Sequence, residues 1–297
     1  MKQSKGDIAF DVVVIILLTL ILLIMIYPMY FILIASISDP GLVVSGKVFL
    51  YPRKVTMESY QMVFETKSIW TGYLNTVIYT VLGTMYNLCT LIPAAYVMSK
   101  KNLPGRGFFS MFFFITMYFG GGMIPTYLLM KNLGLLDTRW VLILGSVSCY
   151  NLIVARQYYQ NSIPESLYEA ARIDGASEFK CFFRIALPLS SSIIAVMTLF
   201  HAVGHWNSYY NALLYVHKAD YYPLQLILRE ILLLNQNVLE GAILDDPDAA
   251  TWAIRRMWIA ESMKYSIIFI SCAPLLVAYP FVQKYFVKGV MIGSVKG

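Results

Sequence analysis

The sequence predicts an all-α polytopic membrane protein. Hydrophobic residues make up 58% of the 297 residues and charged residues only 13%, a balance unlike that of soluble domains. Several apolar runs reach about 20 residues, which is long enough to cross a bilayer as a helix. These runs are continuous rather than alternating, which argues against a membrane β-barrel. We therefore expect six transmembrane helices in a single domain that covers residues 1–297.

Charge and cysteine content exclude several other classes. The formal net charge of +6 fits lipid headgroups and membrane topology better than nucleic acid. Cysteines 89, 149, 181 and 272 fall in apolar or cytoplasmic-type stretches. None has a partner at the spacing of metal ligands, so the sequence predicts neither a disulfide nor a cysteine metal site.

The first predicted helix covers residues 9–36, with Pro28 as a kink. A basic start and the lack of a small-residue cleavage site favour a retained span over a removed signal. In the outer segment that follows, residues 41–48 come within one residue of a phosphate-binding loop. Val48 replaces the hydroxyl that would hold Mg²⁺, and no strand–helix unit surrounds the segment. We interpret it as a glycine-containing turn, not an ATP site.

The second helix is expected over residues 73–98, and a short basic loop follows it. Lys100, Lys101 and Arg106 lie in this loop, which the positive-inside rule places in the cytoplasm. The third helix, 108–130, is interrupted by glycines 120–122 and Pro125. Such a break is tolerated at membrane depth where it faces protein or a water-filled cavity. It therefore either lines a pathway or marks a helix end near the interface.

The remaining helices are expected over residues 140–156, 189–214 and 265–286. An amphipathic or apolar outer helix over 221–239 and an acidic turn over 245–248 separate the last two. Six crossings place both termini in the cytoplasm and the chain in the cell membrane as a multi-pass protein.

The polar loop 162–188, between the fourth and fifth helices, carries helix signals. Ser162 and Glu165 have the spacing of a capping box, and Pro164 suits a first helical turn. Gly175 occupies the position of a left-handed C-cap, so the first short helix should end there. A second short helix should run from Ser177 to Leu187 and end at Pro188. The loop thus predicts a compact two-helix knob.

The same loop carries a spaced motif: Glu169-Ala170-Ala171, three residues, Gly175, nine residues, Ile185, one residue and Leu187-Pro188. This motif resembles the EAA loop of ABC-importer permeases. Similar runs occur at 122–127, 132–138 and 289–297, and the nearest likeness is to the second permease of maltose-type carbohydrate importers. The resemblance implies the type I ABC importer permease fold, with the loop as a coupling helix that docks on a cytoplasmic ATPase. The residues implied in coupling are Leu167, Glu169, Ala170, Ala171, Arg172, Ile173, Asp174, Gly175, Ile185, Leu187 and Pro188. An ordinary amphipathic hairpin on the membrane surface is the alternative.

The resemblance also implies partners and a mechanism. These are a second homologous permease, two ATPase subunits, an extracytoplasmic substrate-binding protein and the lipid bilayer, working by alternating access. ATP and Mg²⁺ would be bound by the ATPases, so this chain is expected to hold no cofactor and to be no enzyme. The sequence of residues 221–229 resembles that of a subgroup of these permeases that handles oligosaccharides from complex polysaccharides. The alternatives are an amino-acid or peptide permease, and a channel or secondary transporter, against which the coupling loop argues.

Polar and aromatic side chains gather in the fifth helix. His201 and His205 share one helical face, as a zinc pair would, but no carboxylate lies nearby in sequence to complete a metal site or an intramembrane enzyme. Aromatic rings could stack on sugars while amides supply hydrogen bonds, and an interfacial aromatic belt is the other interpretation. The candidate substrate-pathway residues are Tyr118, Tyr127, His201, His205, Trp206, Asn207, Tyr210 and Asn211.

Overall fold

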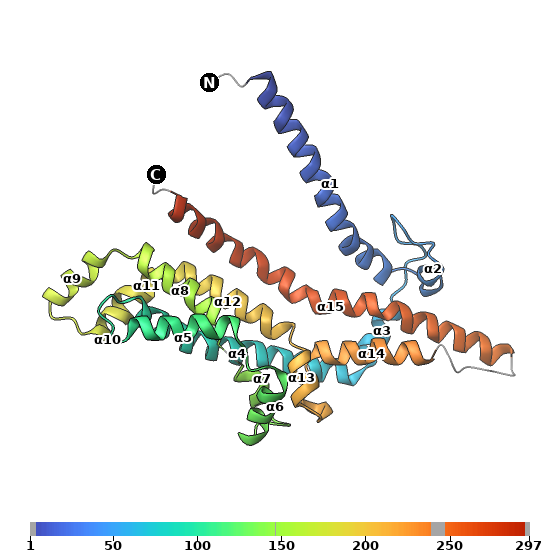
Figure 1. The fold of residues 1–297 in the computed structure, drawn as a ribbon. Coiled ribbons are helices and arrows are strands. Elements are labelled where there is room, and N and C mark those ends of the chain that lie inside the picture. The colour runs from blue at the N-terminus through green and yellow to red at the C-terminus, as the bar shows by residue number, and fades with distance from the viewer. Residues whose placement is uncertain (1–3, 146, 239–246, 295–297) are drawn as a thin grey trace. The chain divides into compact units, whose positions relative to one another are not determined.

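The computed structural model describes residues 4–145, 147–238 and 247–294, which form helices and contain no strand (Figure 1). The predicted all-α fold is therefore confirmed. Two compact units divide the chain: Met1–Ile69 with Leu228–Ala273, and Trp70–Ile227 with Pro274–Gly297. That the chain forms a single domain stays a prediction.

The first unit brings the N-terminal helices together with part of the last helix. It contains α1 (Lys5–Ser36), α2 (Pro40–Val44) and α3 (Glu58–Glu65), with segments of α14 (Leu224–Val238) and α15 (Pro247–Ser294). Its small core is formed by Ile34, Ala35, Val43 and Val48. Arg255 of α15 pairs with Asp39 at 3.1 Å and Glu58 at 2.8 Å, which ties the last helix to the two short ones. Of residues 41–48, which were predicted as a turn, residues 41–44 belong to α2, and a turn at residues 45–46 follows it, with Gly46 at φ +68°.

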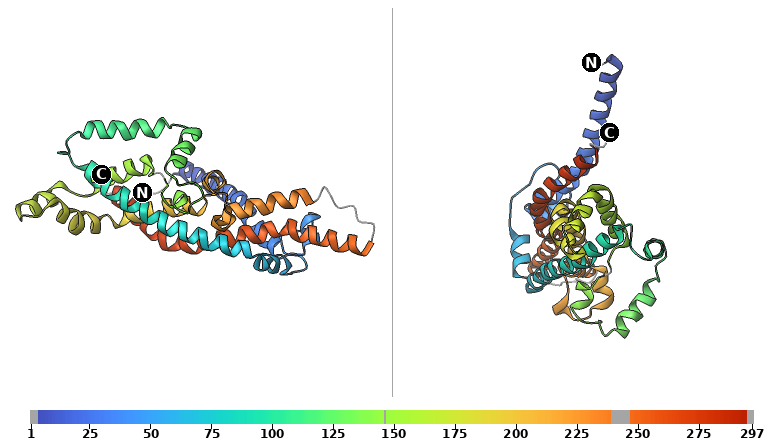
Figure 2. Two further views of the ribbon diagram at one scale, coloured as in Figure 1. Left: turned by 90° about the horizontal axis from the view of Figure 1, so that it is seen from below. Right: turned by 90° about the vertical axis from the view of Figure 1, so that its left-hand side faces the viewer.

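The second unit contains most of α4 (Lys67–Ser99) and the helices that follow it. These are α5 (Arg106–Tyr118), α6 (Met123–Asn132), α7 (Trp140–Ile143), α8 (Cys149–Ser162), α9 (Glu165–Ile173), α10 (Glu178–Cys181), a π-helix (Phe182–Ala186), α11 (Leu187–Leu189), α12 (Ser191–Trp206), α13 (Tyr210–Tyr215) and a 3₁₀ turn (Ala219–Tyr221). One core joins α4, α8, α9 and α12, and another joins α4, α7 and α13. Figures 1 and 2 show the α9–α10 hairpin at one end of the bundle of α4, α8 and α12.

Three helical segments of the described chain are long and apolar enough to cross a membrane: Gly6–Ser36, Lys67–Ser99 and Ile254–Val277. Two bent pairs pass the same test, α5 with α6 at 113° and the segment Glu178–Leu189 with α12 at 77°. Counting each pair as one span gives up to five, so six crossings stay a prediction.

The breaks between helices follow local chemistry. The predicted interruption at residues 120–122 is confirmed, and Gly122 adopts φ +87° before α6. The helix expected over 140–156 is not continuous, because Ser148 caps α8 by accepting a hydrogen bond from the Asn151 amide at 3.3 Å. The helix expected over 189–214 is likewise divided, since α12 ends at Trp206 and α13 begins at Tyr210.

The predicted capping box at Ser162 and Glu165 is wrong. Ser162 is the last residue of α8, and Pro164 is the N-cap of α9, with no side-chain capping hydrogen bond. A residue before proline is driven to extended backbone, and Ile163 accordingly has φ −113° and ψ 113°. Pro164 is itself extended, with ψ 135°, so α9 begins at Glu165. Residues 245–246 of the predicted acidic turn lie outside the described residues, and so do residues 295–297 of the C-terminal run.

Candidate functional site

The loop 162–188, for which the sequence predicts a coupling role, packs on the rest of the second unit through the buried ring of Tyr168. Tyr168 of α9 is 4% exposed and lies in the core with Tyr96 of α4 and Phe182 of the π-helix. Its ring centroid lies 6.0 Å from that of Tyr96, in an edge-to-face arrangement. Burial raises the pKa of the Tyr168 hydroxyl, which keeps the side chain neutral. This contact packs α9 against α4.

The turn between α9 and α10 is a complete Schellman motif. The amide of Ala176 donates to the Ala171 carbonyl at 2.8 Å, and the amide of Gly175 donates to the Arg172 carbonyl at 3.0 Å. Gly175 adopts φ +73°, as this motif requires. The predicted left-handed glycine is thus confirmed, and the turn sets the direction of α10.

An ion pair closes the hairpin across this turn. Arg172 donates from Nε and Nη2 to Oε1 of Glu178 at 3.1 and 3.0 Å, while the Tyr96 hydroxyl donates to Oε2 at 3.2 Å. Burial alone would raise the pKa of Glu178, but Arg172 and the nearby Lys100 cation outweigh it, so this pKa lies below its usual value. Arg172 also lies 4.0 Å from Glu165, at the start of α9. The carboxylate of Glu178 therefore stays charged and fixes α10 against α9 and α4.

Several large apolar side chains of the hairpin are exposed among its charged ones. Ile173 is 87% exposed and Phe179 is 77% exposed, and the rings of Phe179 and Phe183 stack at 6.0 Å. Leu167 is also exposed, beside the exposed Glu169 and Ala170. Side chains this apolar at a protruding tip are typical of a surface that a partner protein covers.

The structure divides the predicted coupling residues into two groups. The exposed ones are Leu167, Glu169, Ala170, Arg172, Ile173, Asp174, Gly175 and Pro188, and the partly buried ones are Ala171, Ile185 and Leu187. Sequence reasoning missed Tyr168, Phe179 and Phe183. The i,i+4 spacing of the two phenylalanines was a visible signal, whereas the burial of Tyr168 depends on α4.

Most predicted pathway residues lie around the break before α6 and the start of α13. The Tyr210 hydroxyl donates to Sδ of Met123 at 3.0 Å, and the rings of Tyr127 and Tyr215 stack at 6.1 Å. These two contacts bring α13 against α6. Asn207, Asn211 and Tyr118 are exposed, whereas Trp206 is 5% exposed and packs edge-to-face on Tyr73.

The two histidines of α12 contact amides of neighbouring helices. His205 Nε2 lies 2.9 Å from Asn87 Nδ2 of α4, and His201 Nε2 lies 3.5 Å from Asn151 Nδ2 of α8. A Cβ at Gly83 would lie 2.4 Å from the His205 ring, so α4 and α12 approach closely only with glycine there. Among the described residues, no three histidine, cysteine or acidic side chains gather as metal ligands.

A polar stripe on α4 faces the same region and was missed in the sequence. Thr80, Thr84 and Asn87 follow the i, i+4, i+7 spacing of one helical face. Thr80 Oγ1, Thr84 Oγ1 and Asn87 Oδ1 are buried without a hydrogen-bond partner in the described part of the chain. Buried polar atoms are normally satisfied, often by water, so this stripe marks a polar zone inside an apolar span.

Comparison with known proteins gives consistent matches over nearly the whole chain. The profile of the family described as "Binding-protein-dependent transport system inner membrane component" matches residues 66–292. Protein LplC of Bacillus subtilis is 37% identical over 304 aligned residues, which cover 100% of this chain and 98% of that protein. The polygalacturonan/rhamnogalacturonan transport system permease protein YtcP of the same organism is 37% identical, covering 97% of this chain and 98% of its own length.

A solved structure is similar to this chain in both fold and sequence. A chain in the crystal structure of a bacterial ABC transporter involved in the import of the acidic polysaccharide alginate superposes with a TM-score of 0.84. It is 34% identical and the match covers 96% of this chain and 99% of that one.

Proposed function

The chain belongs to the family of binding-protein-dependent transport system inner membrane components, and from this membership we propose that it is a permease subunit of an ATP-driven carbohydrate importer. The observation that carries the proposal is the match to a chain of an alginate importer at 34% identity and a TM-score of 0.84. The 37% identity to a polygalacturonan/rhamnogalacturonan permease supports an oligosaccharide derived from a polysaccharide as the cargo.

The family gives the general setting: a multi-pass protein of the cell membrane that works with an ATPase and a substrate-binding protein. Within it, we assign this chain a second, homologous permease and two ATPase subunits, with both termini in the cytoplasm. ATP and Mg²⁺ are bound by the ATPases, and this chain supplies the channel and the coupling loop. Catalysis therefore lies in the partners.

Coupling depends on how force passes from the hairpin to the bundle. The exposed apolar tip, with Ile173 and Phe179, offers contact area to the ATPase. Tyr168 and the Arg172–Glu178 pair then transmit its displacement to α4. A hairpin tied at both its base and its turn moves as a lever, which is what alternating access requires.

The substrate pathway is proposed to pass the break between α5 and α6 and the end of α12. Asn207 and Asn211 present amides, Tyr118 and Tyr210 present aromatic rings, and all four are exposed. Rings of this kind stack on sugars, and amides bond to hydroxyls. Three more residues, His201, His205 and Trp206, are more buried and would support the exposed pathway residues. Tyr127 lies beside the break before α6.

The test is ATPase stimulation in the reconstituted assembly. Purified importer in lipid vesicles would be given its substrate-binding protein loaded with each member of a panel of oligosaccharides, amino acids and peptides. We expect stimulation by acidic oligosaccharides and not by the amino acids or peptides. Stimulation by amino acids or peptides alone would refute the carbohydrate assignment.

A further inference from the structure

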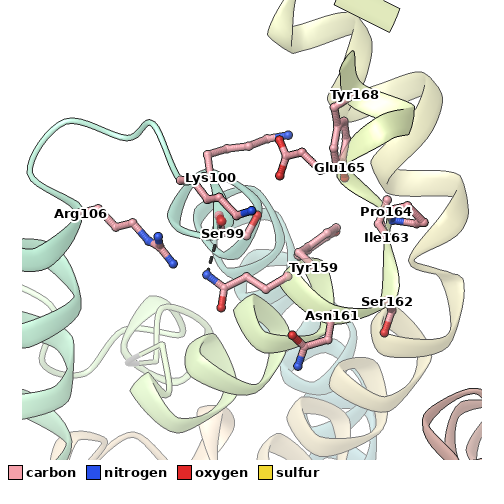
Figure 3. Close-up of a pocket in the computed structure, with 12 residues that line it drawn as sticks. Ser99, Lys100, Arg106, Tyr159, Asn161, Ser162, Ile163, Pro164, Glu165 and Tyr168 are labelled. Carbon is pink, nitrogen blue, oxygen red and sulfur yellow. Dashed lines mark hydrogen bonds between the residues drawn. The ribbon is translucent and has the colours of Figure 1, made fainter. Parts of the chain in front are cut away.

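A cationic cavity lies at the base of the loop 162–188, and no function has been assigned to it above. Its volume is about 980 Å³, and it lies between the end of α4, the loop that follows, the end of α8 and the start of α9 (Figure 3). Of the 12 residues that line it, Lys100, Lys101 and Arg106 are basic and Glu165 alone is acidic. The lining therefore carries an excess of positive charge.

Polar groups complete the lining without neutralising this charge. Gln160 donates to the Ser99 carbonyl at 3.4 Å, the bond dashed in Figure 3, and Asn161 and Ser162 lie on the same wall. The nine-residue α9 begins here with no side chain capping its first amides. A helix N-terminus carries partial positive charge and exposed N–H donors, both of which favour an anion.

The cavity also contains a buried cation that makes no hydrogen bond within the described chain, although the carboxylates of Glu178 and Glu165 act on it through their charge. Lys100 Nζ is buried and finds no hydrogen-bond acceptor among the described residues. It lies 3.3 Å from the Tyr168 ring centroid and 4.3 Å from that of Tyr96, which shield it from direct contact. Burial lowers the pKa of this ammonium, so an anion nearby would stabilise its charged form. Lys101 and Arg106 remain to contact a ligand directly.

The cavity lies where the apolar spans end. The candidate span Lys67–Ser99 stops at the residue before Lys100, and Arg106 is the first residue of α5. The next residues of α5 are apolar and exposed: Phe108 is 71% exposed and Met111 is 58% exposed, as on a lipid-facing helix. The basic side chains thus follow directly on the end of one candidate span and begin the helix of the next.

We propose that this cavity binds the phosphate of an anionic phospholipid headgroup at the boundary between membrane and coupling loop. Basic pockets between transmembrane helices recognise such headgroups through the charge and oxygen acceptors of the phosphate. Inorganic phosphate offers the same chemistry and is the other possible source. A bound headgroup would brace α9 against the end of α4, so lipid composition would influence coupling.

The experiment measures lipid retention by the purified whole importer. The assembly would be exchanged into nanodiscs of phosphatidylcholine with phosphatidylglycerol, and the bound lipids counted by native mass spectrometry. The test variant is Lys101→Gln with Arg106→Gln. The matched control, Lys131→Gln with Lys218→Gln, removes two cations of the same unit that do not line the cavity. We expect phosphatidylglycerol retention to fall about fivefold for each lining cation removed, and to stay unchanged in the control.

A second arm separates the two sources of phosphate. Binding of labelled inorganic phosphate would be measured by dialysis against the assembly in discs of phosphatidylcholine alone. Phosphate binding that the test variant abolishes, with no change in lipid retention, would assign the site to free phosphate and overturn the headgroup. Equal losses in test and control variants, or no loss in either arm, would overturn the site altogether.

A charge-preserving variant serves as the control for correct folding. Lys101→Arg with Arg106→Lys keeps both charges and should retain the lipid. Copurification of the ATPase should be normal in every variant, because neither residue lies on the exposed apolar tip. If the double variant does not assemble, Lys101→Gln alone, at an exposed position, should still lower retention about fivefold. These measurements do not depend on which cargo the importer carries.

Discussion

Single residues decide whether the coupling hairpin keeps its direction, and Gly175 is the clearest of them. Its φ of +73° lies in the left-handed region, and a Cβ built on it meets nothing within 4 Å. Any effect of substitution therefore comes from the backbone rather than from a clash. A left-handed conformation costs an ordinary L-residue about 1–2 kcal/mol, and β-branched residues tolerate it least.

We expect Gly175→Val to leave the protein in the membrane but to lower both ATPase copurification and transport per ATP hydrolysed. Gly175→Asn is the matched control, because asparagine tolerates the left-handed region, and should behave nearly as the native chain. Equal, normal values for both variants would show that the turn does not position the hairpin.

Asp137, in the loop between α6 and α7, should make the stability of the protein depend on pH. Its Oδ1 accepts the His217 amide at 2.5 Å, and His217 Nδ1 lies 3.3 Å from the same oxygen. The amide hydrogen bond is the main reason that the pKa of Asp137 is lowered. A lowered pKa gives stability that is present above the unfolded value of about 3.9 and is lost as pH falls through the folded pKa.

Asp137→Asn keeps the shape and the amide acceptor but removes the charge. The native chain should therefore unfold at a higher temperature than the variant at pH 6, and the gap should close below about pH 4. Thermal unfolding in detergent across this range measures it. A gap that persists undiminished at pH 3 would contradict the assigned cause.

At the scale of elements, the exposed side of α9 and α10 should be the docking surface. Ile173→Asp and Phe179→Asp place charges where the side chains are 87% and 77% exposed, so stability should change by only about 0.5 kcal/mol. ATPase copurification should fall strongly, and charged residues at Leu167, Ala170 or Ala171 should act in the same direction. Leu133→Asp, at a 60% exposed leucine of the same unit, is the control and should assemble normally.

The sequence predicted those features of the elements that short-range chemistry controls. The break at residues 120–122 and the left-handed Gly175 follow from glycine's conformational freedom, and both are confirmed. The start of α9 was misplaced because Pro164 displaced the cap that Ser162 would have made. The burial of Tyr168 depends on α4, more than 60 residues earlier in the chain, and Lys100 is in turn covered by the Tyr168 ring, so no local pattern encodes either.

At the scale of the whole molecule, the proposed pathway should be open to water from one side of the membrane at a time. Single cysteines at Tyr118, Tyr127, Trp206 and Asn207 test this in a background where the four native cysteines are replaced. That background is needed because Cys89 and Cys272 are exposed. Labelling by an impermeant reagent should be faster at Asn207 than at the buried Trp206, and should change when ATP is added. Uniform protection from both sides would rule out a shared cavity.

Substitutions of the proposed pathway residues should affect contact with the cargo without affecting assembly with the ATPase. Alanine at Asn207 or Asn211 should lower uptake without lowering ATPase copurification, with losses of about 1–3 kcal/mol where a polar partner is left unsatisfied. Trp206→Ala also removes the contact with Tyr73, so Trp206→Phe is needed to separate stacking from packing. Unchanged uptake in all these variants would make the residues interfacial anchors.

The close approach of Gly83 to the imidazole of His205 restricts the order in which these two positions can change. The ring fills the space that any larger residue at 83 would need, with a Cβ falling 2.4 Å from it. Replacing the glycine first therefore requires the His205 ring to shift or α4 and α12 to move apart. Replacing His205 first removes the ring and leaves room for a side chain at position 83. Of the two mutational routes from the present pair to an alanine pair, the one that begins at residue 205 avoids the clash.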